Sequence, residues 1–274
     1  MRRAIGIGTT LLLACLALGC PSVPQPSRRN IVVIGARGMK PLLTEISQRY
    51  YQRRPDVRVD LQAALGDRAV ADTRQGLADI GMLGRSLRAE ETGVVGHPLA
   101  RDGVAFVVHR TNNVPLIHET HLVGVLTRVY TTWKDIGGSD RPIFVVGLGD
   151  GRAVRDVLLE YFALRPQQVR PDPSLATSQQ VLQAVAVQPA AIGYCSLGAA
   201  ELFSRKNNSV RLLPLQGVPA TLDNVRNRTY PLLRPLLLLA REHPSADVKE
   251  FLDFACSEEV HDLIQQHGYI PGSP

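Results

Sequence analysis

Between residues 31 and 82 the sequence alternates apolar runs with amphipathic runs, and this order restricts the fold more than any other feature. Residues 31–34 form a continuous apolar run that ends at Gly35, as in a strand buried on both faces. Residues 40–53 are apolar on one side and predict a helix, and residues 57–63 and 79–82 predict strands around a short helix at 70–77. A β-α-β-α-β order favours a parallel sheet covered by helices, and therefore the α/β class.

The second half of the chain repeats this alternation. Its patterns predict strands at 104–109, 142–146, 191–194, 210–213 and 232–240, and helices at 122–129, 157–164, 179–187, 246–256 and 258–266. Two such sets predict two lobes, each a mostly parallel sheet flanked by helices, with the chain crossing between them near Asp102 and Pro231. We expect residues 30–102 and 232–274 to form lobe 1, and residues 103–231 to form lobe 2.

Composition excludes some functions. A hydrophobic content of 45% with 20% charged residues is typical of a globular protein. The net charge of +6 is spread without long like-charge runs and aromatic residues make up only 5%, so we expect no nucleic-acid partner. No Cys/His spacing resembles a zinc site, and neither a G-x-S-x-G nor an H-E-x-x-H motif occurs. We therefore expect no metal, no cofactor and no enzymatic activity.

The first residues predict export. Arg2 and Arg3 precede an apolar run that is short for a membrane span, so residues 1–19 are interpreted as a signal peptide. Small residues directly before Cys20 resemble the lipobox of bacterial lipoproteins, which predicts lipidation of Cys20 and a membrane-anchored protein in the periplasm or at the cell surface. Cys15 is a competing processing cysteine, and an unlipidated secretory signal is the alternative. Residues 20–29, rich in Pro and Ser, are interpreted as a tether.

After processing, Cys195 and Cys256 are the cysteines of the folded part. An extracytoplasmic compartment permits a disulfide between them. Because sequence does not give their separation, we favour the simpler interpretation of two free thiols.

Residues 150–156 predict an anion site, because an apolar run, a glycine turn and a helix start follow one another there. Such a helix end offers unpartnered N–H groups and the positive end of the helix dipole. Gly151, Arg152 and Ala153 are the candidates in this turn. Ligands of parallel sheets lie beyond the carboxyl ends of the strands, so loops after the first strands should reach the same crevice. The candidates in those loops are Ala36, Arg37, Gly38, Gly66, Arg68, Gly84 and Arg85.

Several motifs in order carry a family resemblance. They are residues 76–81 (GLADIG) leading to Arg85, 100–108 (ARDGVAFVV), 133–138 (WKDIGG), 191–197 (AIGYCSL), 217–236 with GVPAT and TYP, and 268–271 (GYIP). With them the chain resembles the phosphate-binding proteins of phosphate ABC transporters, over residues 30–271. The resemblance implies a type II-like periplasmic-binding-protein fold whose two lobes close by a hinge over a ligand. It further implies that the ligand is phosphate or a related small anion, that an ABC transporter permease receives it, and that the protein is a monomer.

The ligand loops depart from the family's pattern of hydroxyls, backbone N–H groups, one arginine and one acidic residue. Leu148 stands where the family has its anchoring arginine, and residues 152–154 replace Ser-Gly-Thr. Arg37, Arg68 and Arg152 are arginines of the altered loops. They either reshape the cleft for a larger or more anionic ligand or are solvated residues at its rim. The alternative function is a sensory or scaffold lipoprotein whose ligand site has changed or been lost.

Four residues match the family but also have structural interpretations. Asp102 is expected to cap an element or fix the hinge, and Arg85 to pair across the lobes when the cleft shuts. Trp133 is expected to pack in the core rather than to bind the ligand. Tyr230, with the proline after it, is expected to set the hinge turn.

Overall fold

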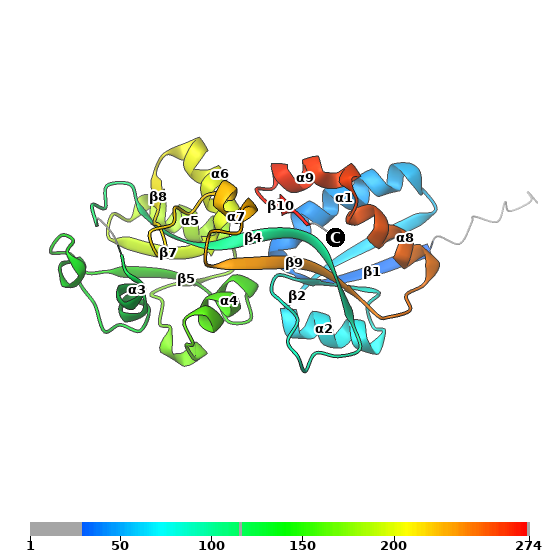
Figure 1. Ribbon diagram of the computed structural model, residues 1–274, viewed down its shortest axis with the longest axis horizontal. Helices are drawn as coiled ribbons and strands as arrows, with labels where there is room; N and C mark the ends of the chain where they lie inside the picture. Colours follow the sequence, from blue (N-terminus) through cyan, green and yellow to red (C-terminus); the bar gives the residue numbers. More distant parts are fainter. Residues whose placement is uncertain (1–28, 115–116, 273–274) are drawn as a thin grey trace, which may run out of the picture.

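The computed structural model describes residues 29–114 and 117–272 (Figure 1). The predicted signal peptide, the lipidation site Cys20 and the tether up to residue 28 lie outside the described residues. The strands are β1 (Arg29–Ala36), β2 (Val57–Ala64), β3 (Ile80–Leu83), β4 (Val95–His109), β5 (Phe144–Leu148), β6 (Ser174–Leu175), β7 (Ala191–Ser196), β8 (Val210–Leu212), β9 (Leu233–Ala240) and β10 (Ile270–Pro271).

Nine helices lie between these strands in the part of the chain that the structure describes, and seven of them correspond to predicted helices. They are α1 (Lys40–Arg53), α2 (Gly66–Gln75), α3 (Glu119–Leu126), α4 (Ala153–Tyr161), α5 (Ser178–Val187), α6 (Leu197–Asn207), α7 (Leu222–Arg226), α8 (Ala246–Ala255) and α9 (His261–Gln266). Short 3-10 turns lie at η1 (Arg37–Met39), η2 (Trp133–Ile136), η3 (Pro166–Gln168) and η4 (Glu258–Val260).

The sheet explains how two lobes form from one chain. Its strand order is β2-β1-β3-β9-β4-β7-β5-β6. Strands β1, β2 and β3 are parallel at one end, and β5, β6 and β7 are parallel at the other. Between these ends, β4 and β9 pair antiparallel and run from one lobe into the other (Figure 1). The predicted α/β, two-lobed class is confirmed, with two long antiparallel strands joining the parallel parts.

Each lobe has its own apolar core, because the central strands are apolar on both faces. One large cluster consists of buried residues between 31 and 100 and between 236 and 269, under α1, α8 and α9. The other consists of buried residues between 104 and 232, joined by Ile270. We call the part with β1–β3, α1, α2, α8 and α9 lobe 1, and the part with β5–β8 and α3–α7 lobe 2.

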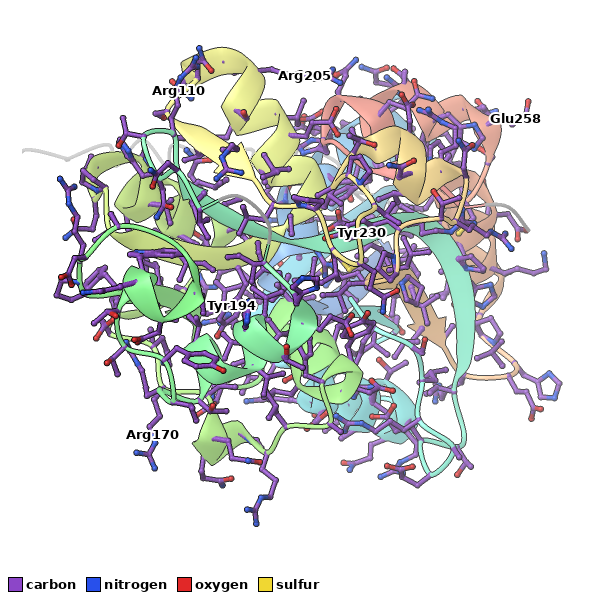
Figure 2. The ribbon with its side chains drawn as sticks, turned by 60° about the vertical axis from the view of Figure 1, so that its left-hand side comes forward. Arg110, Arg170, Tyr194, Arg205, Tyr230 and Glu258 are labelled. Carbon is purple, nitrogen blue, oxygen red and sulfur yellow. The ribbon has the colours of Figure 1, made fainter. Side chains whose placement is uncertain are left out.

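Two buried tyrosines fix strands in lobe 2. Tyr230 donates its hydroxyl to the carbonyl of Val104 on β4 at 3.0 Å, and Tyr194 donates to the carbonyl of Leu148 at 3.2 Å. Figure 2 shows both rings inside the molecule, whereas Arg110, Arg170 and Arg205 project from its surface.

The structure corrects several predicted elements. The helix expected at 70–77 begins at Gly66 and ends at Gly76, whose φ of 75° takes the chain out of the helix. The strand expected at 104–109 begins at Val95, and the helix expected at 122–129 is shifted to Glu119–Leu126, with Arg128 left-handed (φ 65°) after it.

Helices α6 and α7 were absent from the sequence-based prediction. Helix α6 nevertheless has a clear start, because the Ser196 hydroxyl accepts the N–H of Ala199, and a clear end at Asn208, which is left-handed with φ 46°. The predicted strand stopped at residue 194, so the serine that begins this helix was read as part of a motif.

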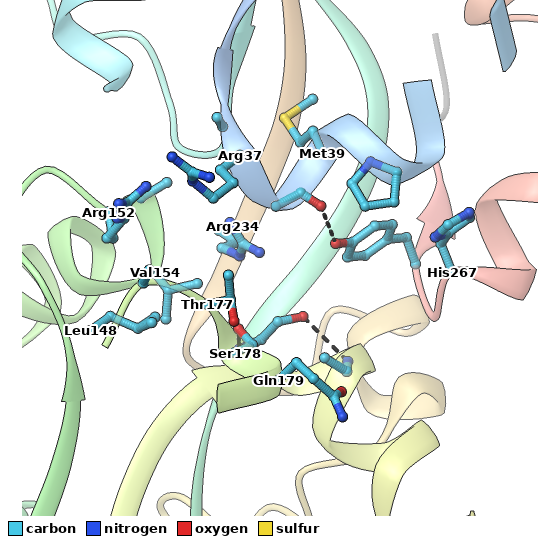
Figure 3. A pocket seen from close by; sticks show the side chains of 18 of the residues that line it. Arg37, Met39, Leu148, Arg152, Val154, Thr177, Ser178, Gln179, Arg234 and His267 are labelled. Carbon is cyan, nitrogen blue, oxygen red and sulfur yellow. Dashed lines mark hydrogen bonds between the residues drawn. The ribbon is translucent and has the colours of Figure 1, made fainter. Parts of the chain in front are cut away.

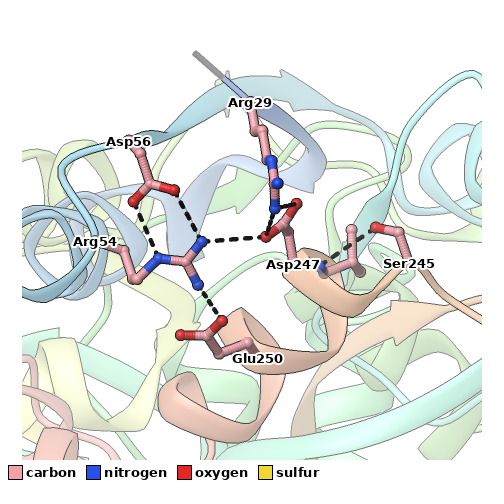
Figure 4. Close-up of polar contacts among 7 residues, drawn as sticks. Arg29, Arg54, Asp56, Ser245, Asp247 and Glu250 are labelled. Atoms are coloured by element: carbon pink, nitrogen blue, oxygen red, sulfur yellow. Dashed lines mark hydrogen bonds and ion pairs between the residues drawn. The ribbon is translucent and has the colours of Figure 1, made fainter. Parts of the chain in front are cut away.

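An ionic cluster joins the first described strand to the C-terminal helices. Arg54, at the end of α1, donates to both carboxylate oxygens of Asp56 at 3.0 and 2.9 Å and contacts Glu250 of α8 (Figure 4). Arg29 donates to Asp247 of α8 at 2.9 Å. These pairs are mostly solvent-accessible, and such pairs contribute about 0–1 kcal/mol each, so the cluster orients α8 more than it stabilises the fold.

Gly198→Ala tests the packing of α6 on lobe 1. A Cβ on Gly198 would lie 1.7 Å from the carbonyl oxygen of Gly268, so backbone would have to move. Since overpacking typically costs about 1–3 kcal/mol, we expect a clearly lower melting temperature by calorimetry. Gly38→Ala is the matched control, because nothing lies within 4 Å of its added methyl group. Equal melting temperatures for the two variants would contradict this packing.

Candidate functional site

A cavity of about 560 Å³ lies between the lobes, where several helices begin (Figure 3). Much of its wall lies just after the carboxyl ends of strands. Lobe 1 contributes the starts of α1 and α2, and lobe 2 contributes the starts of α4, α5 and α6. The lining residues at these starts are Ala36, Arg37, Gly38, Met39, Gly66, Gly151, Arg152, Ala153, Val154, Thr177, Ser178, Gln179, Ser196 and Ala199.

This arrangement favours a negatively charged ligand. A helix start carries a partial positive charge, and its first N–H groups are free where no side chain caps them. Neither α2 nor α4 has a side-chain hydrogen bond capping its start, so a ligand can accept from these N–H groups.

Two of the three loop arginines lie at the cavity. Arg37 of lobe 1 and Arg152 of lobe 2 both line it and lie at the same end (Figure 3). Within residues 29–114 and 117–272, neither forms an ion pair with an acidic side chain. Arg68 does not line the cavity: it lies on the outer side of α2, 72% exposed, and pairs with Asp72 at 3.1 Å. Arg37 and Arg152 are therefore placed to contact a ligand in the cavity, whereas Arg68 is not.

Arg85 is held inside lobe 1 rather than paired across the lobes. Its guanidinium is 2% exposed and donates to Glu91 at 2.6 and 2.8 Å and to Asp67 at 2.8 Å. The hydrogen bond to Glu91 is the main cause that raises the pKa of Arg85, and it lowers the pKa of Glu91. Arg85 therefore joins the loop after β3 to the first turn of α2 through Asp67, on the side away from the cavity.

A buried ion pair forms the floor of the cavity. Asp102 of β4 is fully buried and accepts from Arg234 of β9 at 2.7 and 3.1 Å. The same carboxylate accepts from the Ser196 hydroxyl at 2.8 Å and from the Gly198 N–H at 3.1 Å, both at the start of α6. Arg234 lines the cavity and donates its third bond to the carbonyl of Gly84 at 3.2 Å. One carboxylate thus joins both crossing strands to a helix start, as expected of a residue that fixes the hinge region.

Gly84 belongs to this floor although it does not line the cavity. A Cβ on it would lie 2.8 Å from the Arg234 guanidinium and 2.9 Å from the Cβ of Ala153 in lobe 2. A residue without a side chain is therefore required where the two lobes touch.

Arg155 holds the turn between β5 and α4 in place. It is almost fully buried, donates to the carbonyls of Leu148 at 3.2 Å and Pro166 at 2.8 Å, and pairs with Asp150 at 3.0 Å. This fixes the backbone of residues 148–154, which reach the cavity. Leu148 gives the cavity an apolar wall at this point.

Sequence reasoning missed the hydroxyls of the α5 start. Thr177 Oγ1 accepts the Gln180 N–H at 3.2 Å, and Ser178 Oγ accepts the Ser196 N–H at 3.1 Å. Because each oxygen already accepts a backbone hydrogen, each hydroxyl proton remains available to a ligand. A Thr-Ser pair directly before a predicted helix was the available signal.

The remaining conspicuous residues are structural. Trp133 is buried and donates its indole N–H to the carbonyl of Ala190 at 2.9 Å, which confirms the predicted packing role. Cys195 and Cys256 are free thiols, and burial raises the pKa of Cys256 to about 11. Over the described part of the chain, no group of three His, Cys, Asp or Glu side chains is arranged to hold a metal ion. None of the helices in that part is long and apolar enough to cross a membrane.

Two α/β lobes, two crossing strands and an interlobe cavity surrounded by helix starts define the class of two-lobed ligand-binding proteins with a type II-like periplasmic-binding-protein fold. The chain belongs to the PBP superfamily, since the profile of the PBP superfamily domain matches residues 21–259.

Several proteins to which the chain is similar have names or titles that mention phosphate. The chain is 25% identical over 249 residues to the phosphate-binding protein PstS of Bacillus subtilis, covering 88% of this chain and 80% of the relative. A PstS of Borreliella burgdorferi is 22% identical, with 95% of each chain covered. A Clostridium perfringens protein solved with bound phosphate is 27% identical, with a TM-score of 0.78, and covers 89% of this chain and 100% of its own. The Vibrio vulnificus OxyR2 regulatory domain, at 16% identity and a TM-score of 0.56, shares the fold alone.

Arg234→Met tests the floor of the cavity. It leaves the Asp102 carboxylate buried without its cation, and breaking a buried pair costs about 3–5 kcal/mol. We expect this loss of unfolding free energy by urea denaturation. The double variant Asp102→Asn/Arg234→Met removes both charges and should cost less than the sum of the single variants. A mild effect of the single variant, or strict additivity, would show that the pair does not hold the strands.

Proposed function

We propose that the protein is an extracytoplasmic substrate-binding protein that binds phosphate or a related small anion in its interlobe cleft and delivers it to an ABC transporter permease. The observation that carries this proposal is the convergence of helix starts from both lobes on one cavity, with Arg37 and Arg152 at one end. The phosphate named for its relatives, including one solved with phosphate bound, supports the choice of ligand. The Clostridium perfringens protein is described as a phosphate ABC transporter substrate-binding protein, which also favours binding over catalysis.

Within this function we assign the binding contacts to both sides of the cleft. Arg37 and Arg152 supply charge, and the backbone at Ala36, Gly38, Gly66, Gly151 and Ala153 supplies N–H groups or close approach. Gly84 and Arg85 act from behind the cavity wall, through Arg234 and Asp67 respectively. Arg68 is assigned to the solvated surface because it pairs with Asp72.

The chain organisation follows from the same proposal. Residues 1–19 serve as a signal peptide, Cys20 carries a lipid, and residues 20–29 tether a monomeric domain to the membrane. Residues 30–102 with 232–274 form lobe 1, and residues 103–231 form lobe 2. The separate apolar cores of the two parts support this division.

A sensory or scaffold lipoprotein is the second candidate function. It is favoured by the altered loops, in which Leu148 and Val154 present apolar walls to the cavity.

Ligand-induced stabilisation distinguishes the two candidates. A ligand that binds only the native state stabilises it by about 2.7 kcal/mol at a hundredfold excess over its Kd. We expect phosphate at millimolar concentration to raise the melting temperature in a thermal-shift assay, with an equal ionic strength of chloride as control. The absence of any shift would favour the sensory or scaffold function.

Charge removal at the cavity tests the assigned contacts. Hydrogen bonds to charged groups contribute about 1.5–3 kcal/mol, so Arg37→Ala and Arg152→Ala should each weaken phosphate binding about tenfold or more by calorimetry. Arg68→Ala is the matched control, since it removes the same charge from a paired, exposed arginine outside the cavity. A loss of affinity equal in all three variants would point to a general charge effect and against the assignment.

A further inference from the structure

We propose that the cleft accepts a tetrahedral oxyanion carrying an organic group, such as a phosphate monoester or a phosphonate, and binds it more tightly than inorganic phosphate. This inference rests on the proposed anion-binding function and adds the class of substrate. In it, the oxyanion lies at the Arg37 and Arg152 end, and the organic group occupies the remainder of the cavity.

The size of the cavity is the first argument. Phosphate has five non-hydrogen atoms and fills on the order of 100 Å³, given about 30 Å³ for a water molecule. The cavity measures about 560 Å³, which lies within the range of about 300–1,000 Å³ that is usual for sites of larger organic ligands. Inorganic phosphate would leave most of this space to water.

Separated lobes do not account for this volume, because the lobes already touch at three places. Gly84 of lobe 1 lies so close to Ala153 of lobe 2 that an added Cβ would be 2.9 Å from the Ala153 Cβ. A Cβ on Gly151 would be 3.0 Å from the Leu65 side chain of lobe 1. At α6, Gly198 packs on the backbone of Gly268. The space is therefore a partly open cleft between lobes in contact, and its volume follows from the shape of the walls.

The chemistry of the walls changes along the cavity. Figure 3 shows Arg37 and Arg152 at one end and His267 at the other. The walls from α6 present three half-buried apolar side chains, Ala199, Leu202 and Phe203. These apolar side chains can contact a carbon group, and they lie beside the polar residues Lys206 and Asn207 of the same helix and Gln266 and His267 at the end of α9.

Away from Arg37 and Arg152, the cationic side chains His267 and Lys206 are poorly suited to bind a second anionic group of the ligand. His267 already lies 3.0 Å from the Glu45 carboxylate, and Lys206 is an exposed lysine. Arg234, which also lines the cavity, is already paired with Asp102, so a pyrophosphate would place its second charge beside the apolar side chains of α6, where a charge loses hydration.

Two hydroxyl groups line the cavity between the arginine end and the apolar side chains of α6, where the proposed ligand passes from its oxyanion to its organic group. Thr177 and Ser178 line the cavity beside Arg234, and each retains a proton to donate. They suit an ester oxygen or a hydroxyl group of the substituent.

Calorimetric titration with phosphate, phenyl phosphate and pyrophosphate tests the proposal. We expect phenyl phosphate to bind at least tenfold more tightly than phosphate, and pyrophosphate to bind more weakly than phenyl phosphate. Phosphate binding as tightly as phenyl phosphate, or pyrophosphate binding most tightly, would overturn this inference and leave the proposed anion-binding function intact. Binding of none of the three would overturn both.

Variants of α6 test where the organic group lies. Ala199→Phe fills the apolar part, so it should abolish the advantage of phenyl phosphate while phosphate affinity stays within twofold. Phe203→Ser removes an apolar wall and leaves a larger, more polar space, so it should reduce the same advantage, which keeps the test valid if Ala199→Phe does not fold. Arg152→Ala should weaken both ligands together. An undiminished advantage of phenyl phosphate in both α6 variants would overturn the placement.

Discussion

The hydrogen bonds of the Asp102 carboxylate are the interaction on which the arrangement of the molecule depends. A buried carboxylate is costly unless every oxygen has partners, and this one has Arg234, the Ser196 hydroxyl and the Gly198 N–H. These partners come from β9 and from the start of α6, while Asp102 itself lies on β4. The strands that cross between the lobes are thereby fixed to the helix that walls the cavity. Through Arg234 the same network reaches the carbonyl of Gly84, at the contact between the lobes.

The preference of the cavity for an anion comes from backbone N–H groups more than from side chains. Helix starts from both lobes lie at it, and α2 and α4 lack side-chain caps, so their N–H groups favour an anion at this place. Arg37 and Arg152 add positive charge from opposite lobes, and in the proposed function the anion binds to both. The apolar side chains of α6 then favour a ligand that carries an organic group in addition to its oxyanion.

Much of this was predictable from the sequence, and the exceptions have physical reasons. Apolar runs predicted β1, β2, β3, β5 and β7 of the two parallel parts but not the two-residue strand β6, and the glycine turn before α4 predicted that residues 151–153 lie at the site. The outer face of α2 could not be recognised from spacing alone, since the helix begins earlier than its apolar periodicity, and so Arg68 was grouped with Arg37 and Arg152. Phe203 and the other α6 residues were missed because that helix starts on a serine inside a strand-like motif. The pairing of Asp102 with Arg234 is a contact between distant strands, which no local pattern contains.

A crystal structure of the protein grown with phosphate tests the central claim most directly. The account predicts a phosphate between Arg37 and Arg152, accepting from the backbone N–H groups at the start of α4, with the lobes in contact at Gly84 and Ala153. A cavity that stays empty at saturating phosphate, or a phosphate bound only outside it, would contradict the account.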